Sequence, residues 1–124
     1  MGMEVWLYSH GSNGEFTIDT IQRCYTLKSL WNDRAVRSTW KKLPKQSAIV
    51  FYKDARCSGD SITSRNTPSG SYSFEDSGKL NKEVSSFMVY TTSEDPSMGK
   101  VEITADDPGS LFDKAELNGT TGSQ

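Results

Sequence analysis

The chain has 124 residues, of which 34% are hydrophobic and 24% charged, and its formal net charge is −2 at pH 7. This length and composition predict one compact domain with a modest core, and no stretch reaches the roughly 18 apolar residues that span a bilayer. Residues 1–90 carry 12 Lys and Arg against 9 Asp and Glu, whereas residues 91–124 carry 2 against 7. Because nucleic-acid binding usually needs a strong basic excess, the acidic tail argues against it.

Short strands bounded by turn residues are expected along the first half of the chain. Residues 5–8 are a β-branched and aromatic run, which is typical of a buried strand. Gly and Asn in residues 9–14 allow a tight reversal. Residues 15–19 then alternate polar and apolar side chains, as a returning strand does, and residues 37–40 are expected to form a closing strand.

The second half repeats this order. Residues 49–52 are a second aromatic run, residues 55–60 a reversal, residues 71–75 an alternating strand like 15–19, and residues 85–90 a closing strand. With one further strand in each half besides the three named, the sequence predicts four strands per half and eight in all.

Residues 91–124 form an acidic C-terminal extension. They are rich in Ser, Thr, Gly, Asp and Pro, a composition typical of a partly flexible tail. Residues 100–104 alternate well enough to add one edge strand to the domain.

The two halves share a spaced pattern that indicates an internal duplication. In each half a Tyr precedes a Gly-containing turn, and an Asp or Asn stands five positions before a later Ser. These residues are Tyr8, Gly14, Asp33 and Ser38 in the first half and Tyr52, Gly59, Asn81 and Ser86 in the second. A unit of about forty residues is too short to bury its own apolar face, so two copies must pack together as one domain.

This pattern resembles the βγ-crystallin Greek-key motif. The second copy matches well, with six residues between Tyr52 and Gly59 and with Ser86 ending its later segment. The first copy is looser, because Gly14 comes one place early.

The resemblance implies an all-β fold, a two-Greek-key sandwich of about eight antiparallel strands in two sheets, with one strand exchanged between them. The domain would cover residues 4–90, with motifs at about 4–43 and 48–90. The acidic, partly flexible extension would follow at residues 91–124.

The resemblance also implies structural roles for the repeated residues. In the family, the Gly lets the first hairpin of each motif fold over, and the Ser hydroxyl pins that fold by hydrogen bonding. These roles fall to Gly59 with Ser86, and to Gly14 with Ser38.

Calcium-binding members of the family carry two adjacent Asn or Asp residues and a hydroxyl ligand before the final Ser, because a hard cation prefers oxygen ligands. In the second copy Asn81 and Ser85 match, but Lys82 takes the second acidic or amide place. In the first copy Arg34 and Arg37 take the corresponding places. Because these cations oppose a divalent ion, we expect no cofactor and no tight metal site, with Asn81 and Ser85 as at most one weak calcium site.

Cys24 and Cys57 allow two interpretations. A bridge between them would join residues 33 positions apart, stabilise the fold by about 3 kcal/mol and favour a secreted protein. The alternative is two buried, reduced thiols in a cytosolic protein, because one pair is weaker evidence than a dense disulfide framework. For a secreted protein, we expect the signal peptide to be absent from this sequence, since Met3 leads directly into the first strand.

The sequence carries no recognisable catalytic pattern. Its one histidine, His10, lies in a Gly/Ser/Asn turn without an obvious nucleophile partner. Adjacent carboxylates such as Glu75 and Asp76 lie in polar loops, where neighbours usually point apart. We therefore predict a non-catalytic protein.

A basic cluster with interleaved aromatics lies between the two copies. Its candidate partner-binding residues are Trp31, Arg34, Arg37, Trp40, Lys41 and Lys42. Exposed aromatics and cations together can bind a protein, carbohydrate or lipid surface. The alternative is that the tryptophans fill the core while the cations form a solvated loop, since large aromatics are mostly buried.

Two functional hypotheses remain open. The first is a secreted, monomeric, non-catalytic binding protein that acts on another organism or protein as a toxin, elicitor, effector or inhibitor, with an unidentified surface partner. The second is a structural or stress-related crystallin-like protein, whose function would depend on its stable fold. It would be cytoplasmic if its cysteines are reduced.

Overall fold

The computed structural model describes residues 2–28 and 31–105. In chain order its elements are β1 (Met3–Tyr8), β2 (Asn13–Ile18), β3 (Cys24–Leu27), β4 (Arg37–Lys41), β5 (Ala48–Asp54), β6 (Ser58–Ser64), β7 (Gly70–Ser73), α1 (Phe74–Ser77), β8 (Ser86–Tyr90) and β9 (Lys100–Ile103). Within this part of the chain, no helix has the length and apolar character needed to cross a membrane.

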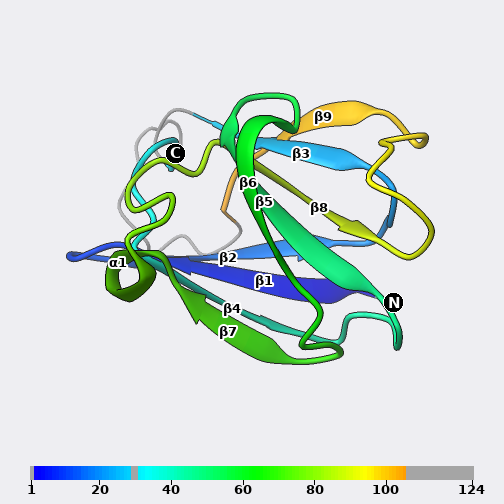
Figure 1. Cartoon of the computed structure of the whole chain (residues 1–124), viewed down its shortest axis with the longest axis horizontal. Coiled ribbons are helices and arrows are strands. Elements are labelled where there is room, and N and C mark those ends of the chain that lie inside the picture. The colour runs from blue at the N-terminus through cyan, green and yellow to red at the C-terminus, as the bar shows by residue number, and fades with distance from the viewer. Residues whose placement is uncertain (1, 29–30, 106–124) are drawn as a thin grey trace, which may run out of the picture.

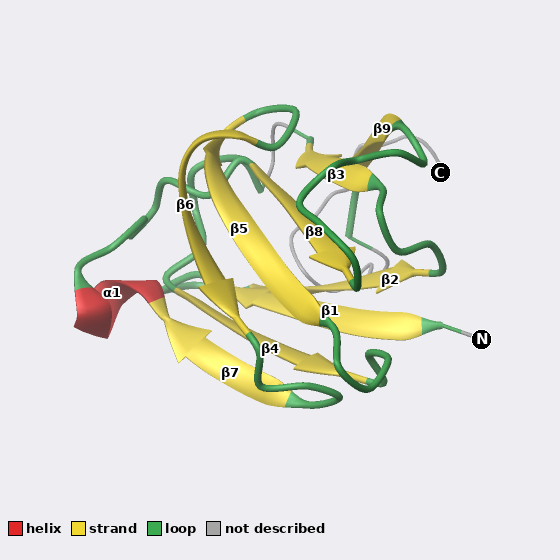
Figure 2. Cartoon of the chain, turned by 45° about the vertical axis from the view of Figure 1, so that its right-hand side comes forward, coloured by secondary structure: helices red, strands yellow, loops and turns green. Residues whose placement is uncertain are grey.

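The strands form two sheets packed face to face (Figures 1 and 2). Sheet A has the order β2-β1-β4-β7, and sheet B has the order β6-β5-β8-β3-β9. The third strand of each half lies in the sheet of the other half, because β3 pairs with β8 and β7 pairs with β4, both antiparallel. The predicted all-β, two-Greek-key, βγ-crystallin-like sandwich is confirmed, and the strand exchange is reciprocal.

The extension adds β9 to the edge of sheet B, within the residues where the alternation predicts a strand. β9 runs parallel to its neighbour β3, whereas the other paired strands are antiparallel. The expected flexible tail beyond Ala105 lies outside the described residues.

The prediction that residues 71–75 form the returning strand of the second half is wrong. The strand that returns from β5 is β6, and β7 is the exchanged strand. The chain then turns into α1, because the Ser73 hydroxyl accepts a hydrogen bond from the Asp76 N–H at 3.0 Å and caps the helix start. Gly78 ends the helix in the left-handed region, with φ of 75°, and Phe74 is buried in the core.

Both sheets contribute aromatic rings to one shared core. Phe16 of sheet A and Phe51 and Phe87 of sheet B are fully buried. The ring centroid of Phe87 lies 6.2 Å from that of Phe16 and 6.3 Å from that of Phe51, contacts that add about 0.5–1.5 kcal/mol each to the burial of the rings. Since these side chains come from both halves, neither half has a closed core of its own.

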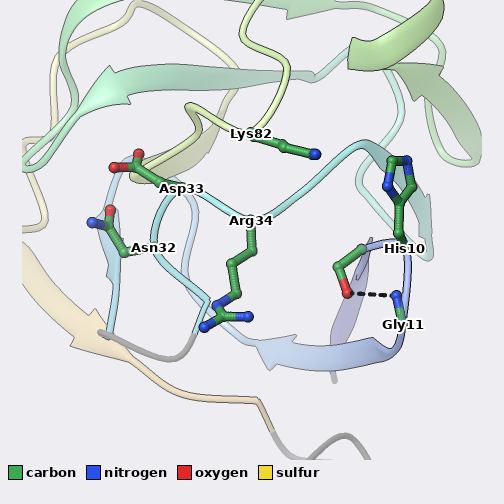
Figure 3. A pocket seen from close by; sticks show the side chains of 7 residues that line it. His10, Gly11, Asn32, Asp33, Arg34 and Lys82 are labelled. Atoms are coloured by element: carbon green, nitrogen blue, oxygen red, sulfur yellow. Dashed lines mark hydrogen bonds between the residues drawn. The ribbon is translucent and has the colours of Figure 1, made fainter.

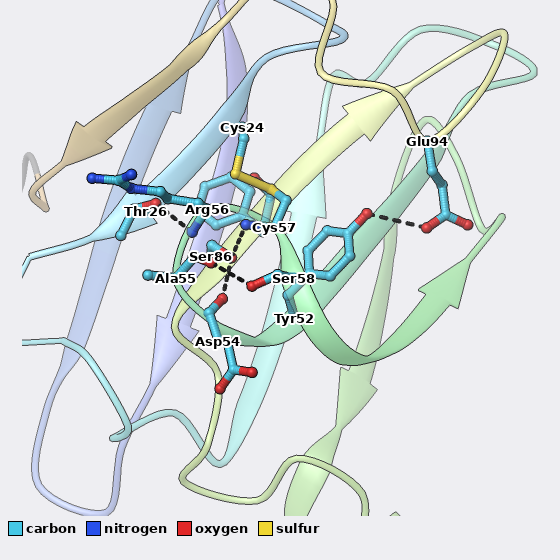
Figure 4. Close-up of a disulfide and its surroundings, with 11 residues drawn as sticks. Cys24, Thr26, Tyr52, Asp54, Ala55, Arg56, Cys57, Ser58, Ser86 and Glu94 are labelled. Carbon is cyan, nitrogen blue, oxygen red and sulfur yellow. Dashed lines mark hydrogen bonds between the residues drawn. A yellow bond between two sulfur atoms is a disulfide. The ribbon is translucent and has the colours of Figure 1, made fainter.

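The β5–β6 hairpin folds over and is held there by Ser86 (Figure 4). The Ser86 hydroxyl donates to the Asp54 carbonyl oxygen at 2.6 Å and accepts from the Cys57 N–H at 2.8 Å. Gly59 has φ of 79°, and a Cβ there would collide with the Asp54 carboxylate. The hydroxyl thus satisfies two backbone groups of the turn, and the glycine supplies the conformation that the turn needs.

The first half uses the corresponding residues differently. The Ser38 hydroxyl donates to the Trp6 carbonyl oxygen at 2.9 Å. Gly14 is outside the positive-φ region and lies against the Trp31 indole, where a Cβ would stand 2.8 Å from Nε1. In this half the glycine therefore allows a close approach between backbone and ring.

A disulfide joins Cys24 of β3 to Cys57 of the β5–β6 turn, with the Cα atoms 5.9 Å apart. Beside it, the Arg56 N–H donates to the Thr26 hydroxyl at 3.0 Å. Figure 4 shows the disulfide and this hydrogen bond next to the Ser86 contacts. The bridge therefore links β3, which is the exchanged strand of the first half, with the β5–β6 hairpin of the second half.

We expect Ser86→Ala to lower the free energy of unfolding by about 1–3 kcal/mol, because the Asp54 carbonyl and the Cys57 N–H lose their buried partner. Ser71→Ala removes an exposed hydroxyl of β7 and is the control, with a change below about 0.5 kcal/mol. Urea denaturation followed by tryptophan fluorescence measures both variants. Equal effects would contradict the pinning role of Ser86.

Replacing both cysteines by serine should lower the free energy of unfolding by about 3 kcal/mol, because the bridge restricts the unfolded chain over a separation of 33 residues. Denaturation of the double variant, and of the wild-type protein with and without dithiothreitol, measures the effect. An unchanged denaturation midpoint after verified reduction would show that the bridge carries no stability.

Candidate functional site

The outer face of sheet A carries a group of partly exposed aromatic and polar side chains. Along β1, Val5 and Leu7 point into the core, and the period of two therefore turns Trp6 and Tyr8 to the outside. On β4, Arg37 and Thr39 point outward by the same alternation. We call Trp6, Tyr8, Arg37 and Thr39 the aromatic platform.

Contacts within the aromatic platform fix its rings. The ring centroids of Trp6 and Tyr8 are 6.5 Å apart, with an interplanar angle of 19°. The Arg37 guanidinium carbon lies 4.0 Å from the Tyr8 ring centroid, a cation–π geometry, and the Tyr8 hydroxyl lies 3.1 Å from the Thr39 hydroxyl oxygen. These contacts follow from the strand register, which places Tyr8 opposite Arg37 and Trp6 opposite Thr39.

Polar side chains surround the aromatic platform. On β2, Glu15 stands opposite Trp6 and Asn13 opposite Tyr8. At one end, the Lys42 ammonium pairs with the Glu4 carboxylate at 3.1 Å. The face thus has an aromatic centre and a hydrogen-bonding, charged rim, which is the layout of a protein interface.

The structure places some of the predicted partner-binding residues at the surface and others in the core. Arg37 and Lys41 lie on the outer face of sheet A, and Lys42 lies at its end, whereas Trp31 and Trp40 are only 3% and 1% exposed. Of the two interpretations of these tryptophans, the binding surface is wrong and the placement in the core is confirmed.

Specific contacts hold both tryptophans inside. The Trp40 indole N–H donates to the Asn66 carbonyl oxygen at 2.7 Å, and Trp31 packs edge-on against Phe16 with centroids 6.2 Å apart. The aromatics that do face outward are Trp6 and Tyr8, which sequence reasoning assigned only to a buried strand. Residues 5–8 are all hydrophobic and show no polar–apolar alternation. The signal that could have found Trp6 and Tyr8 is the strand period of two counted from the polar Glu4, which puts them on the same face as that residue.

Arg34 lies elsewhere, in a hollow at the junction of the two halves (Figure 3). The hollow is lined by Ser9, His10, Gly11, Asn32, Asp33, Arg34 and Lys82. Asp33 and Lys82 both have positive φ, 61° and 57°. The Asp33 N–H donates to the Val84 carbonyl at 3.1 Å and the Lys82 N–H to the Ala35 carbonyl at 2.9 Å. These reciprocal bonds give Asp33 and Lys82 equivalent places in the two halves, so the pairing of Asp33 with Asn81 and of Arg34 with Lys82 that the sequence spacing predicts is wrong.

The two weak calcium candidates, Asn81 and Ser85, make different contacts at this junction. The Ser85 hydroxyl donates to Asp33 Oδ1 at 3.2 Å, whereas Asn81 Oδ1 is buried with no hydrogen-bond partner. Lys82 stands where the first half has Asp33. Among residues 2–28 and 31–105, no group of three or more His, Cys, Asp or Glu side chains could hold a metal ion.

His10 is exposed and hydrogen-bonded, with Nε2 2.8 Å from Glu75 Oε2. The contact joins the β1–β2 turn to α1. His10 therefore links two surface segments.

Gln22, which the sequence analysis did not single out, anchors the segment between β8 and β9. Its side-chain NH₂ donates to the carbonyls of Ser93 and Asp95, each at 2.8 Å, and its Oε1 accepts from the Thr91 N–H at 2.9 Å. Because one side chain satisfies several backbone groups, it orders a loop that has little apolar content.

Tyr52 adds a second anchor by donating its hydroxyl to Glu94 Oε1 at 3.1 Å (Figure 4). Burial raises the pKa of Tyr52 above its ordinary value of 10.0, and the Glu94 carboxylate raises it further. The phenol therefore stays protonated and available as a donor at neutral pH.

The comparisons with known proteins concern the fold alone. No protein-family model matches the chain, and no curated protein matches it either. Among solved structures, the chain is similar to the crystal structure of the N-terminal domain of protein S, with a TM-score of 0.46 and 20% sequence identity. The match covers 74% of this chain and 98% of that domain.

Calcium should leave the stability of this protein unchanged, because Arg34 and Lys82 line the hollow and Asp33 already accepts the Ser85 hydroxyl. Isothermal titration with calcium chloride, and melting curves with calcium or with EDTA, measure this. Binding at micromolar calcium, or a higher melting temperature with calcium than with EDTA, would contradict the expectation.

Proposed function

We propose that the protein is a secreted, non-catalytic binding protein of the toxin, effector or inhibitor type, which docks a partner protein of another organism on the aromatic platform. The observation that carries the proposal is the contact between Trp6, Tyr8 and Arg37 on one open sheet face. Trp, Tyr and Arg are the residue types that supply most of the binding energy in protein interfaces.

Preorganisation supports this role for the aromatic platform. Tyr8 is held by the Arg37 guanidinium on its ring and by its hydroxyl contact with Thr39. A partner would therefore meet side chains that have already lost much of their rotamer freedom, which reduces the entropic cost of binding.

The disulfide supports secretion. Such bonds persist in oxidising environments and are rare in the cytosol, where thiols are kept reduced. The shape of the site supports binding over catalysis, because the aromatic platform lies on an exposed sheet face, whereas small-molecule and active sites are concave.

Arg37→Glu should weaken partner binding by about thirtyfold, the effect of losing roughly 2 kcal/mol at an interface hot spot. The disulfide-bonded protein is immobilised and exposed to the extracellular protein fraction of candidate host cells. Captured proteins are identified by mass spectrometry, and each is then expressed and titrated against the wild-type and variant proteins.

Arg65→Glu is the matched control, since the Arg65 guanidinium lies 5.9 Å from the Tyr90 ring centroid on sheet B. The control should bind as the wild type does. Equal losses in the two variants, or capture of no protein that depends on Arg37, would overturn the proposal. If a polysaccharide bound with the same dependence on Arg37, the partner would be a carbohydrate and not a protein.

A further inference from the structure

Among the described residues, β9 presents an unpaired backbone edge. It hydrogen-bonds to β3 on one side, where the Cys24 N–H donates to the Gly99 carbonyl at 2.9 Å and the Lys28 N–H donates to the Ile103 carbonyl at 3.0 Å. Because backbone groups alternate in direction along a strand, those of Lys100 and Glu102 point away from β3. Within the described residues no strand pairs with this edge.

The side chains along this edge are exposed. Lys100, Val101 and Glu102 all lie at the surface, and Val101 and Met98 are 40% and 54% exposed, the only large hydrophobic side chains of the described residues at this level. The unpaired backbone of an edge strand is a template for pairing with another chain, and charged edge residues oppose such pairing unless opposite charges face them.

The charges of β9 complement those of a second copy. In an antiparallel pair centred on Val101, Lys100 of one copy stands opposite Glu102 of the other, and the reverse pair forms across the two-fold axis. The same register joins the outward N–H and C=O groups of Lys100 to those of Glu102 as hydrogen-bonded pairs. It places the two Val101 residues in a non-hydrogen-bonded pair, where Cα atoms approach to about 4.5 Å.

The other sheet edges lack this complementarity. Within β2 the only charged residue is Glu15, within β6 it is Asp60, and β7 carries none. Self-pairing of these strands would therefore gain no ion pair.

The segment that leads into β9 is held in place. The Met98 N–H donates to the Gln22 carbonyl oxygen at 2.8 Å, and the Arg23 Nε–H donates to the Met98 carbonyl at 3.1 Å. A fixed edge loses little conformational entropy when it pairs.

We propose that β9 is a self-association edge, through which two copies pair antiparallel about Val101 and join their two sheets B into one continuous sheet. The monomer that we expect from the sequence would then be the dissociated form of this dimer. Since the aromatic platform lies on sheet A, the dimer leaves it free and carries two platforms, which raises the effective affinity for a partner with two sites.

Charge exchange tests the proposal. Lys100→Glu and Glu102→Lys each place like charges opposite one another and should weaken dimerisation at least about tenfold. The double variant K100E/E102K should restore it, and an equimolar mixture of the two single variants should form the heterodimer. Sedimentation velocity and light scattering over protein concentrations up to about 1 mM measure association, because the contact is small.

Circular dichroism and melting curves confirm that the variants fold, which is expected since both side chains are exposed. A wild-type protein that remains monomeric over the whole range would overturn the proposal. Single variants that associate as the wild type does, or a mixture of single variants that fails to associate, would also overturn it. Binding at the aromatic platform is measured separately with Arg37→Glu, so the two proposals can fail independently.

Discussion

The exchange of β3 and β7 between the sheets is the constraint on which the rest of the structure depends. β3 leaves the first half to pair with β8, and β7 leaves the second half to pair with β4. Each sheet therefore contains strands from both halves, and both halves contribute side chains to the aromatic core. The disulfide reinforces the same exchange, because it ties β3 to the hairpin of the second half.

The outer faces of the two sheets are covered differently, and this difference determines where the candidate site lies. On sheet B the outer side chains form a second buried cluster of Ala48, Val50, Tyr52, Met88 and Tyr90, against which Cys57 of the folded hairpin packs. Glu94 of the following segment bonds to Tyr52. On sheet A nothing comparable covers Trp6 and Tyr8 within the described residues, so the aromatic side chains of that face remain available to a partner.

The strands at residues 5–8 and 49–52 could be predicted from local composition, and the exchange of strands from the family resemblance. For Trp31 and Trp40 the sequence left two interpretations open, because these large aromatics stand among cations, and only the packed sheets show that they turn inward. The helix α1 depends on a cap formed by Ser73 and on the burial of Phe74, which alternation alone does not reveal. The anchoring by Gln22 joins residues about seventy positions apart, a separation over which sequence carries no local signal.

The contacts at the junction between the motif ends are the reason for expecting no tight metal site in this fold. Asp33 of the first half accepts the Ser85 hydroxyl of the second, and reciprocal backbone hydrogen bonds from Asp33 and Lys82 cross the same boundary. Oxygen atoms that could have shared a cation are thus used in direct contacts between the halves. A Lys at the place equivalent to Asp33 adds a fixed positive charge there, which raises the cost of placing a divalent cation beside it.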